Sequence, residues 1–151
     1  TDPIEARAAA ARAHGAGWTG SPETEDIVRA VQAREPLGLD LVFDCCGKPA
    51  ALDQGVELLK PGGTLLLVGI PEEDRVSFSI DKLRRGELRI QNVRRQNACM
   101  QPVLDMIEMD GLDPDFMITH RFPLADTAAA FECVAGYRDG VIKAMIDVQH
   151  R

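Results

Sequence analysis

Residues 60–70 read KPGGTLLLVGI, and this stretch decides the fold class. Its first four residues, KPGG, predict a turn. The apolar run Thr64–Val68 follows, and a strand that is apolar on both faces belongs inside a sheet covered by helices on both sides. Gly69 then ends the run. The stretch therefore predicts a buried strand of a parallel sheet that opens into a turn at its carboxyl end.

Strand and helix patterns alternate on both sides of this stretch. Residues 39–43 (LDLVF) have the composition of a strand, and residues 49–59 place apolar side chains at helical spacing. Such alternation with short turns predicts an α/β fold with a parallel sheet. The alternation ends after Arg95. The elements expected along the chain are helices at residues 4–14, 23–34, 49–59, 100–109 and 123–137, and strands or extended segments at residues 18–19, 39–43, 64–68, 88–93, 116–122 and 141–148.

The composition is that of an ordinary globular protein of one-domain length. The chain has 151 residues, of which 45% are hydrophobic, 27% charged and only 5% aromatic, so we expect an aliphatic core. A net charge of −7 argues against nucleic acid as the main partner. No apolar run approaches the roughly 20 residues that cross a bilayer. The chain begins with Thr1 rather than Met, which leaves its true N-terminus open.

The four cysteines show no metal-binding spacing. Cys45 and Cys46 are adjacent, and adjacent residues rarely reach disulfide geometry. Neither they nor Cys99 and Cys133 form a CxxC pair or have a histidine at zinc-finger distance. The pattern predicts reduced thiols in a cytoplasmic protein and no metal site built from this chain alone.

Five segments occur in a characteristic order and spacing: residues 43–47 (FDCCG), 59–64 (LKPGGT), 68–70 (VGI), 118–124 (ITHRFPL) and 139–143 (DGVIK). Together they resemble the C-terminal part of zinc-type medium-chain dehydrogenases, with polyol and threonine dehydrogenases the most similar subgroup. No single motif is decisive, but the ordered set is specific and covers nearly the whole chain.

The resemblance implies a partial Rossmann domain at residues 1–94, a doubly wound parallel sheet without its first βα unit. Residues 95–151 would be the C-terminal segment that returns to the catalytic domain. In the family's strand order, 3-2-1-4-5-6, the missing first strand lies at the centre. Its absence would leave unpaired strand edges, so we expect an isolated chain that is marginally stable, rearranges or pairs with another chain.

The resemblance also implies an NAD-dependent, zinc-containing alcohol or polyol dehydrogenase, which transfers a hydride between a secondary alcohol and NAD. The family's zinc ligands lie in an N-terminal domain that this sequence lacks, so the chain would contribute no catalytic residue and no metal ligand and would be inactive alone. The intact enzyme would be a homodimer or homotetramer, joined at a sheet edge near residues 76–80.

Two residues near the N-terminus would address the adenosine ribose of NAD. The resemblance places Asp2 at the end of the family's second strand, where a carboxylate accepts the ribose hydroxyls and repels the extra phosphate of NADP. Asp2 followed by Pro3 is also a typical start of a helix, with Asp2 as its N-cap. Arg7 would lie beside the adenine or ribose, or it is a solvated helix arginine.

Two turns would address the nicotinamide end. The backbone of Val68, Gly69 and Ile70 would bind the carboxamide, and Gly69 would let the ring approach. The alternative is an ordinary turn after a strand. The run Arg94-Arg95-Gln96 would approach the nicotinamide ribose and pyrophosphate, because a guanidinium suits phosphate; the alternative is a solvated basic turn. The family has one arginine here, so two leave the contacting residue open.

Other polar residues are assigned lesser roles. Cys46 and Gly47 would flank the cofactor groove, with Cys46 a packed thiol rather than a nucleophile. His120 would belong to the return segment, and Lys143 would reach the pyrophosphate or the substrate cleft.

Three other functions fit parts of the sequence. A zinc-free NADPH-dependent quinone or enoyl reductase prefers a basic or small residue where Asp2 stands. A methyltransferase also has an acidic residue after its second strand, but the segments at residues 68–70 and 119–122 fit it poorly. The third is a non-enzymatic Rossmann-like binding module.

Overall fold

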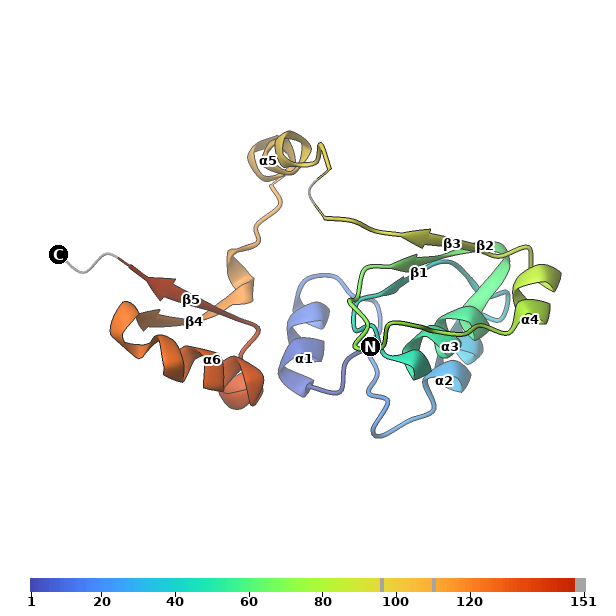
Figure 1. The fold of residues 1–151 in the computed structure, drawn as a ribbon, viewed down its shortest axis with the longest axis horizontal. Coiled ribbons are helices and arrows are strands. Elements are labelled where there is room, and N and C mark those ends of the chain that lie inside the picture. Colours follow the sequence, from blue (N-terminus) through green and yellow to red (C-terminus); the bar gives the residue numbers. More distant parts are fainter. Residues whose placement is uncertain (96, 110, 149–151) are drawn as a thin grey trace. The chain divides into compact units, whose positions relative to one another are not determined.

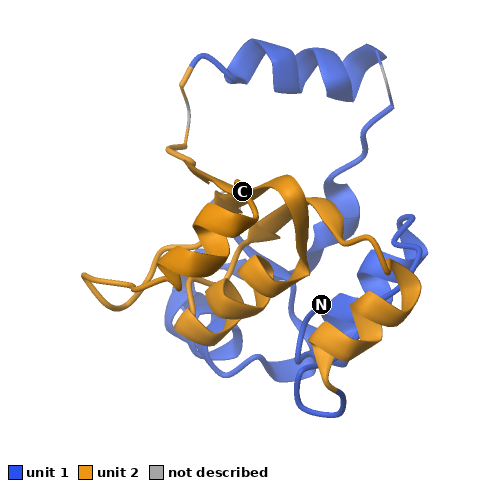
Figure 2. Ribbon diagram, turned by 90° about the vertical axis from the view of Figure 1, so that its right-hand side faces the viewer, with its two compact units in different colours: residues 1–25, 98–151 blue, residues 26–97 orange. Residues whose placement is uncertain are grey.

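The computed structural model describes residues 1–95, 97–109 and 111–148 (Figure 1). These residues form two compact units, coloured separately in Figure 2. Unit 1 contains residues 1–25 and 98–151, and unit 2 contains residues 26–97. The division at residue 94 that the resemblance implies concerns the domains of a full-length dehydrogenase, and it stays a prediction.

Unit 2 contains a three-stranded parallel sheet. Its strands are β1 (Leu39–Asp44), β2 (Leu59–Leu67) and β3 (Arg89–Asn92), in the spatial order β1-β2-β3 (Figure 1). The central place of β2 confirms the prediction from its apolar run, and Leu65 at its middle has no exposed surface. The α/β fold class with parallel strands is confirmed.

The helices of unit 2 are α2 (Ile27–Arg34), α3 (Pro49–Leu58) and α4 (Ile80–Arg85). Helix α2 begins later than residue 23 because the carboxylate of Asp26 accepts the N–H of Arg29 at 3.1 Å and so caps the helix there. Sequence patterns did not predict α4, which has only six residues and no buried one.

Helix α3 packs closely on β2 and forms the core of unit 2. Leu52 and Val56 of α3 are buried against Leu65. A Cβ atom at Gly55 would lie 3.0 Å from Cδ1 of Leu65, so the glycine lets helix and strand approach. Partly buried side chains complete this core, namely Val42, Leu59, Leu67, Val76, Phe78, Leu83 and Leu88.

The turn predicted at residues 60–63 lies inside β2 as a bulge. Leu39 pairs with Leu59, and the next pair is Leu41 with Thr64, so the intervening residues of β2 loop out of register. Gly62 has a φ of +78° and donates its N–H to the carbonyl of Gly86 at 2.7 Å. The glycines and the proline predicted a turn before the strand, whereas strand pairing begins before these residues and continues after them.

Strand β1 has a free edge, and one face of it is apolar and exposed. Its pairing partner among the described residues is β2 alone. Leu41 and Phe43 are 53% and 60% exposed, on the face opposite Val42. The expected unpaired edge is therefore present in unit 2. Helix α3 covers only the other face, whereas the sequence predicted cover on both.

The sheet edge expected near residues 76–80 is in a different place. Residues 76–79 form no strand, and Ile80 begins α4. The second edge of the sheet is β3. The sequence there alternates apolar and polar residues, but residues 76–79 pair with neither edge strand among the described residues of unit 2.

Unit 1 contains helices α1 (Glu5–Ala13), α5 (Met100–Met109) and α6 (Thr127–Ala135), and the parallel strands β4 (Ile118–Pro123) and β5 (Lys143–Asp147). Helix α5 has the predicted bounds. The helix predicted at residues 123–137 is shorter, because a separate 3₁₀ turn precedes it and Gly136 ends it. The three 3₁₀ turns of this unit are η1 (Asp115–Met117), η2 (Leu124–Asp126) and η3 (Arg138–Gly140).

The strand predicted at residues 18–19 does not form. Among the described residues, the one backbone hydrogen bond that resembles strand pairing in this region is the N–H of Asp2 donated to the carbonyl of Gly20 at 3.1 Å. A strand needs a ladder of such bonds. The β-favouring Trp18 and Thr19 therefore stay irregular.

We expect Leu65→Ala to lower the free energy of unfolding by about 2–5 kcal/mol, because it leaves a cavity in a fully buried position. The matched control is Leu37→Ala, where the side chain is 86% exposed and the change should stay within about 0.5 kcal/mol. Urea unfolding followed by circular dichroism measures both. Equal losses of unfolding free energy in the two variants would contradict the assignment of Leu65 to the core.

Candidate functional site

The buried carboxylate of Asp44 organises the turn that follows β1. Its side chain is 5% exposed. Oδ1 and Oδ2 accept the N–H of Gly47 at 3.0 and 3.1 Å, and Oδ1 also accepts the N–H of Cys46 at 3.2 Å. A carboxylate that accepts backbone N–H groups two and three residues ahead stabilises a tight turn.

The backbone of Asp44 also holds the turn that follows β2. Its carbonyl oxygen accepts the N–H of Val68 at 2.9 Å and the N–H of Gly69 at 2.8 Å. One residue at the end of β1 thus fixes two neighbouring turns. Both lie at the carboxyl edge of a parallel sheet, which is where open α/β sheets bind ligands.

The two turns are so close that each needs a glycine. A Cβ atom at Gly69 would overlap the backbone nitrogen of Gly47 and lie 2.8 Å from Oδ2 of Asp44. Gly47 has a φ of +68°, and a Cβ there would lie 2.7 Å from the carbonyl carbon of Ile70. The sequence predicted a role for Gly69 in ligand approach, and the structure adds its close contact with Gly47.

The second turn presents unused backbone groups. Among the described residues, no backbone hydrogen bond uses the carbonyls of Val68 and Gly69 or the N–H of Ile70. The side chains of Val68 and Ile70 are 41% and 78% exposed. This turn therefore offers acceptors and a donor at an accessible sheet edge.

The surroundings of Cys46 favour the protonated form of its thiol. Its thiol donates a hydrogen bond to Oδ1 of Asp44 at 3.3 Å. Partial burial raises the pKa of the Cys46 thiol, and the hydrogen bond to Asp44 and the negative charge of that carboxylate raise it further. The sequence predicted a packed thiol, but the side chain is exposed. A protonated thiol is a weak nucleophile, so the structure gives Cys46 no catalytic role.

Arg94 and Arg95 follow β3 at the same sheet edge. Leu67 pairs with Asn92, and Val93 donates its N–H to the carbonyl of Leu67 at 3.0 Å, so the ends of β2 and β3 lie together. Both arginines are exposed, and neither forms an ion pair with a described residue. Gln96 lies outside the described residues.

Asp2 lies in unit 1, just before α1. Its Oδ1 accepts the N–H of Ile4 at 2.8 Å, and no hydrogen bond from a described residue reaches Oδ2. Ile4 is the N-cap of α1, and it offers no side-chain bond. The prediction that Asp2 is the N-cap is wrong, because the carboxylate closes a turn two residues before the helix instead.

Arg7 lies in the first turn of α1. Its Cζ is 4.8 Å from the centre of the Tyr137 ring, and its Nε is buried without a hydrogen-bond partner. The guanidinium is therefore stacked on an aromatic ring. The sequence offered a nucleotide contact or a solvated arginine, and this contact with a distant residue was not expected.

His120 and Lys143 lie on the paired strands of unit 1. His120 is in β4, with Nδ1 2.9 Å from Oγ1 of Thr119, and its place in a return segment stays a prediction. Lys143 is the exposed first residue of β5. Neither makes a contact that assigns it a chemical role.

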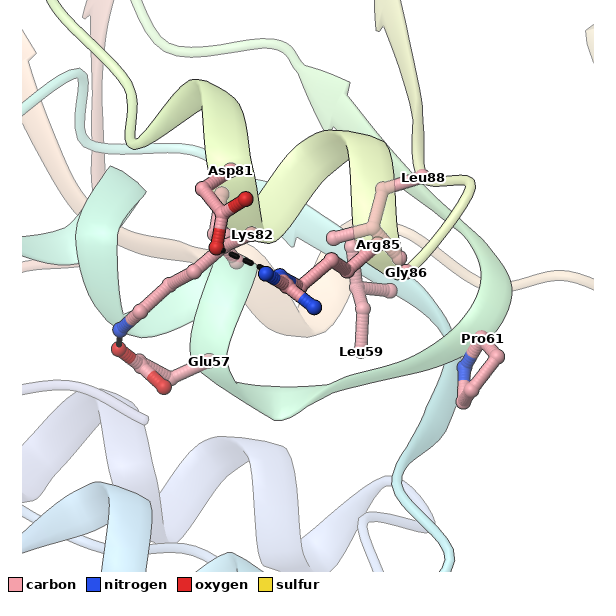
Figure 3. A pocket seen from close by; sticks show the side chains of 9 residues that line it. Glu57, Leu59, Pro61, Asp81, Lys82, Arg85, Gly86 and Leu88 are labelled. Atoms are coloured by element: carbon pink, nitrogen blue, oxygen red, sulfur yellow. Dashed lines mark hydrogen bonds and ion pairs between the residues drawn. The ribbon is translucent and has the colours of Figure 1, made fainter.

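A shallow pocket of about 280 Å³ lies at the opposite, amino end of β2 (Figure 3). Its two cationic side chains are paired, Lys82 with Glu57 and Arg85 with Asp81 at 2.7 Å. Leu59 and other apolar residues line the rest. Because its charges are satisfied internally, this pocket is not a candidate nucleotide site.

The described residues contain no group of three or more His, Cys, Asp or Glu side chains that could hold a metal ion. The four thiols are free. In the same part of the chain, no helix has the length and apolar character needed to cross a membrane.

Comparison with known proteins agrees with this geometry. The sequence profile of the family described as "Zinc-binding dehydrogenase" matches residues 1–109. The chain is 30% identical over 149 residues to the uncharacterized zinc-type alcohol dehydrogenase-like protein YdjJ of Escherichia coli K12, covering 97% of this chain and 42% of that protein. It is 33% identical over 113 residues to D-xylulose reductase of Saccharomyces cerevisiae, covering 73% and 31%.

Among solved structures, alcohol dehydrogenase TADH from Thermus sp. ATN1 superposes with a TM-score of 0.90 and 25% identity, over 98% of this chain and 43% of that one. The chain belongs to the zinc-binding dehydrogenase family, a family of oxidoreductases. It corresponds to the C-terminal portion of the family's medium-chain fold, and it spans about two fifths or less of the length of these relatives.

We expect Gly69→Ala to be destabilised by about 1–3 kcal/mol, because the new Cβ must displace the backbone of Gly47. Gly17→Ala is the control, since a Cβ there meets nothing within 4 Å. Midpoints of urea unfolding compare the two. An unchanged midpoint for Gly69→Ala would show that the two turns are not in close contact.

The alkylation rate of Cys46 should rise with pH around a midpoint above the ordinary value for a cysteine, because its pKa is raised. Asp44→Asn should lower this midpoint, since it removes the negative charge beside the thiol. Iodoacetamide labelling mapped by mass spectrometry measures the profile. The exposed Asp74→Asn is the control for the charge change. A profile that Asp44→Asn leaves unmoved would rule out the assigned cause.

Proposed function

We propose that this chain is the coenzyme-binding and C-terminal portion of an NAD-dependent, zinc-containing alcohol or polyol dehydrogenase. The observation that carries the proposal is the pair of turns fixed by Asp44, with unused backbone groups on Val68, Gly69 and Ile70. The reaction of the intact enzyme would be hydride transfer between a secondary alcohol and NAD, with zinc supplying a Lewis acid for the alcohol oxygen.

The turn after β2 would hold the nicotinamide carboxamide. A carboxamide needs an acceptor for its NH₂ and a donor for its oxygen. The carbonyl of Val68 and the N–H of Ile70 are an acceptor and a donor that no described backbone group uses. Gly69 between them has no side chain, so a planar ring can approach the backbone.

The loop after β3 would address the ribose and pyrophosphate of the nicotinamide half. Arg94 and Arg95 are exposed and not neutralised by a described carboxylate. A guanidinium donates two parallel hydrogen bonds to a phosphate. Gln96 would contact the same part of the nucleotide.

Asp2 in unit 1 would bind the adenosine ribose. Its Oδ1 is engaged by Ile4, which fixes the carboxylate, while Oδ2 is open to accept a ribose hydroxyl. The negative charge would repel the 2′-phosphate of NADP, which argues for NAD over NADP and against the NADPH-dependent reductases. Arg7 would lie beside the same ribose or the adenine.

The chain alone would bind nucleotide without turnover, because its described residues include no candidate metal ligand set. The zinc ligands and the pocket for a small alcohol or polyol would lie in the portion of a full-length relative that this chain does not cover. The intact enzyme would be a cytoplasmic homodimer or homotetramer.

Calorimetric titration tests the cofactor preference. We expect NAD to bind the chain at least about tenfold more tightly than NADP, since the carboxylate of Asp2 disfavours a second negative group, and tenfold corresponds to about 1.4 kcal/mol. Asp2→Asn should bring the affinities for NAD and NADP closer together. Glu23→Gln, an exposed charge change in the same unit, should not.

Equal binding of NAD and NADP by the unaltered chain would contradict the role of Asp2. Heat on addition of S-adenosylmethionine would favour the methyltransferase alternative. Oxidation of a polyol by the chain with NAD and zinc added would contradict its proposed inactivity.

A further inference from the structure

The turn after α6 packs against the first turn of α1, within unit 1. Gly140 has a φ of +69°, and a Cβ there would lie 3.1 Å from Cβ of Ala6. Val141, the next residue, is 1% exposed. Residues 137–141 and the first turn of α1 are far apart in the sequence but pack against each other, and we call this contact the joint.

Tyr137 occupies a strained position in this joint. Its φ and ψ are 50° and 38°, in the left-handed region, and Asp139 shares that conformation with a φ of 52°. Side chains other than glycine and asparagine rarely adopt it, and such strain persists only where surrounding structure holds it and often accompanies function. The Tyr137 ring is 57% exposed, so burial of the ring does not explain the strain.

The ring of Tyr137 stacks with Arg7. The distance from Cζ of Arg7 to the ring centre is 4.8 Å. No described residue forms an ion pair or hydrogen bond with the side chain of Arg7, and its buried Nε has no partner. An arginine held by an aromatic face, rather than by a carboxylate, keeps its outer Nη donors available for a ligand.

We infer that Tyr137 is a positioning residue for the adenosine-binding end, acting through Arg7. It holds the guanidinium in one orientation, so a bound adenosine phosphate does not have to immobilise a mobile side chain. The inference rests on the proposed function, in which Asp2 and Arg7 contact the adenosine half of the nucleotide. It assigns the C-terminal segment a part in nucleotide binding.

The experiment titrates the 151-residue chain with 5′-AMP and follows the fluorescence of Trp18, the single tryptophan. Trp18 is a suitable reporter because Gly20, two residues on, accepts the N–H of Asp2. Tyr137→Leu should weaken AMP binding about two- to fivefold, the equivalent of one exposed cation–π contact. Tyr137→Phe keeps the ring and should stay within about twofold of the unaltered chain.

Two comparisons separate positioning from simple destabilisation. In the background of Arg7→Gln, adding Tyr137→Leu should cause no further loss, because the residue through which Tyr137 acts is gone. Phe131→Leu on α6 is the matched control, since it also replaces an aromatic side chain, one that is 72% exposed, and should leave AMP affinity unchanged.

Each outcome decides the inference. Rescue by phenylalanine together with non-additive losses supports it. If Asp2→Asn weakens AMP binding but Tyr137→Leu does not, the inference is overturned while the proposed function stands. Additive losses, or equal losses for both Tyr137 variants, also overturn it. If the unaltered chain does not bind AMP, the proposed adenosine end fails and the inference fails with it.

Discussion

The hydrogen bonds made by Asp44 are the constraint on which the candidate site depends. One buried residue closes its own turn with its carboxylate and fixes the turn after the neighbouring strand with its carbonyl. Parallel pairing of β1 with β2 brings the two strand ends together, and the core packing of Leu65 holds that register. The site is therefore a property of backbone geometry, and it needs few reactive side chains.

Much of the fold could be predicted from sequence because its strongest signals are local. The apolar run of β2 located the centre of the sheet, and the helix predicted at residues 100–109 has the bounds of α5. The strand at residues 18–19 failed because a strand requires a partner, which local composition cannot supply. Residues 60–63 predicted a turn where the structure has a bulge, since glycine and proline indicate a break in the strand but not the size of that break.

The site was predicted unevenly for a related reason. Val68 to Ile70 could be found because they follow a recognisable strand. The turn closed by Asp44 could have been predicted, because an aspartate three residues before a glycine is typical of a turn closed by a side chain. The contact between Arg7 and Tyr137 joins residues 130 positions apart, and no local pattern connects them. Long-range contacts of this kind emerge only once the fold is known.

The free edge of β1 has a consequence for the fate of the chain in a cell. The unpaired backbone groups along the edge of β1 are a template for pairing with another exposed strand, and Leu41 and Phe43 add exposed apolar surface beside them. Chaperones bind such surfaces, and proteases degrade the chains that expose them. The steady-state amount of this chain would then follow the supply of whatever covers β1, rather than its own rate of synthesis.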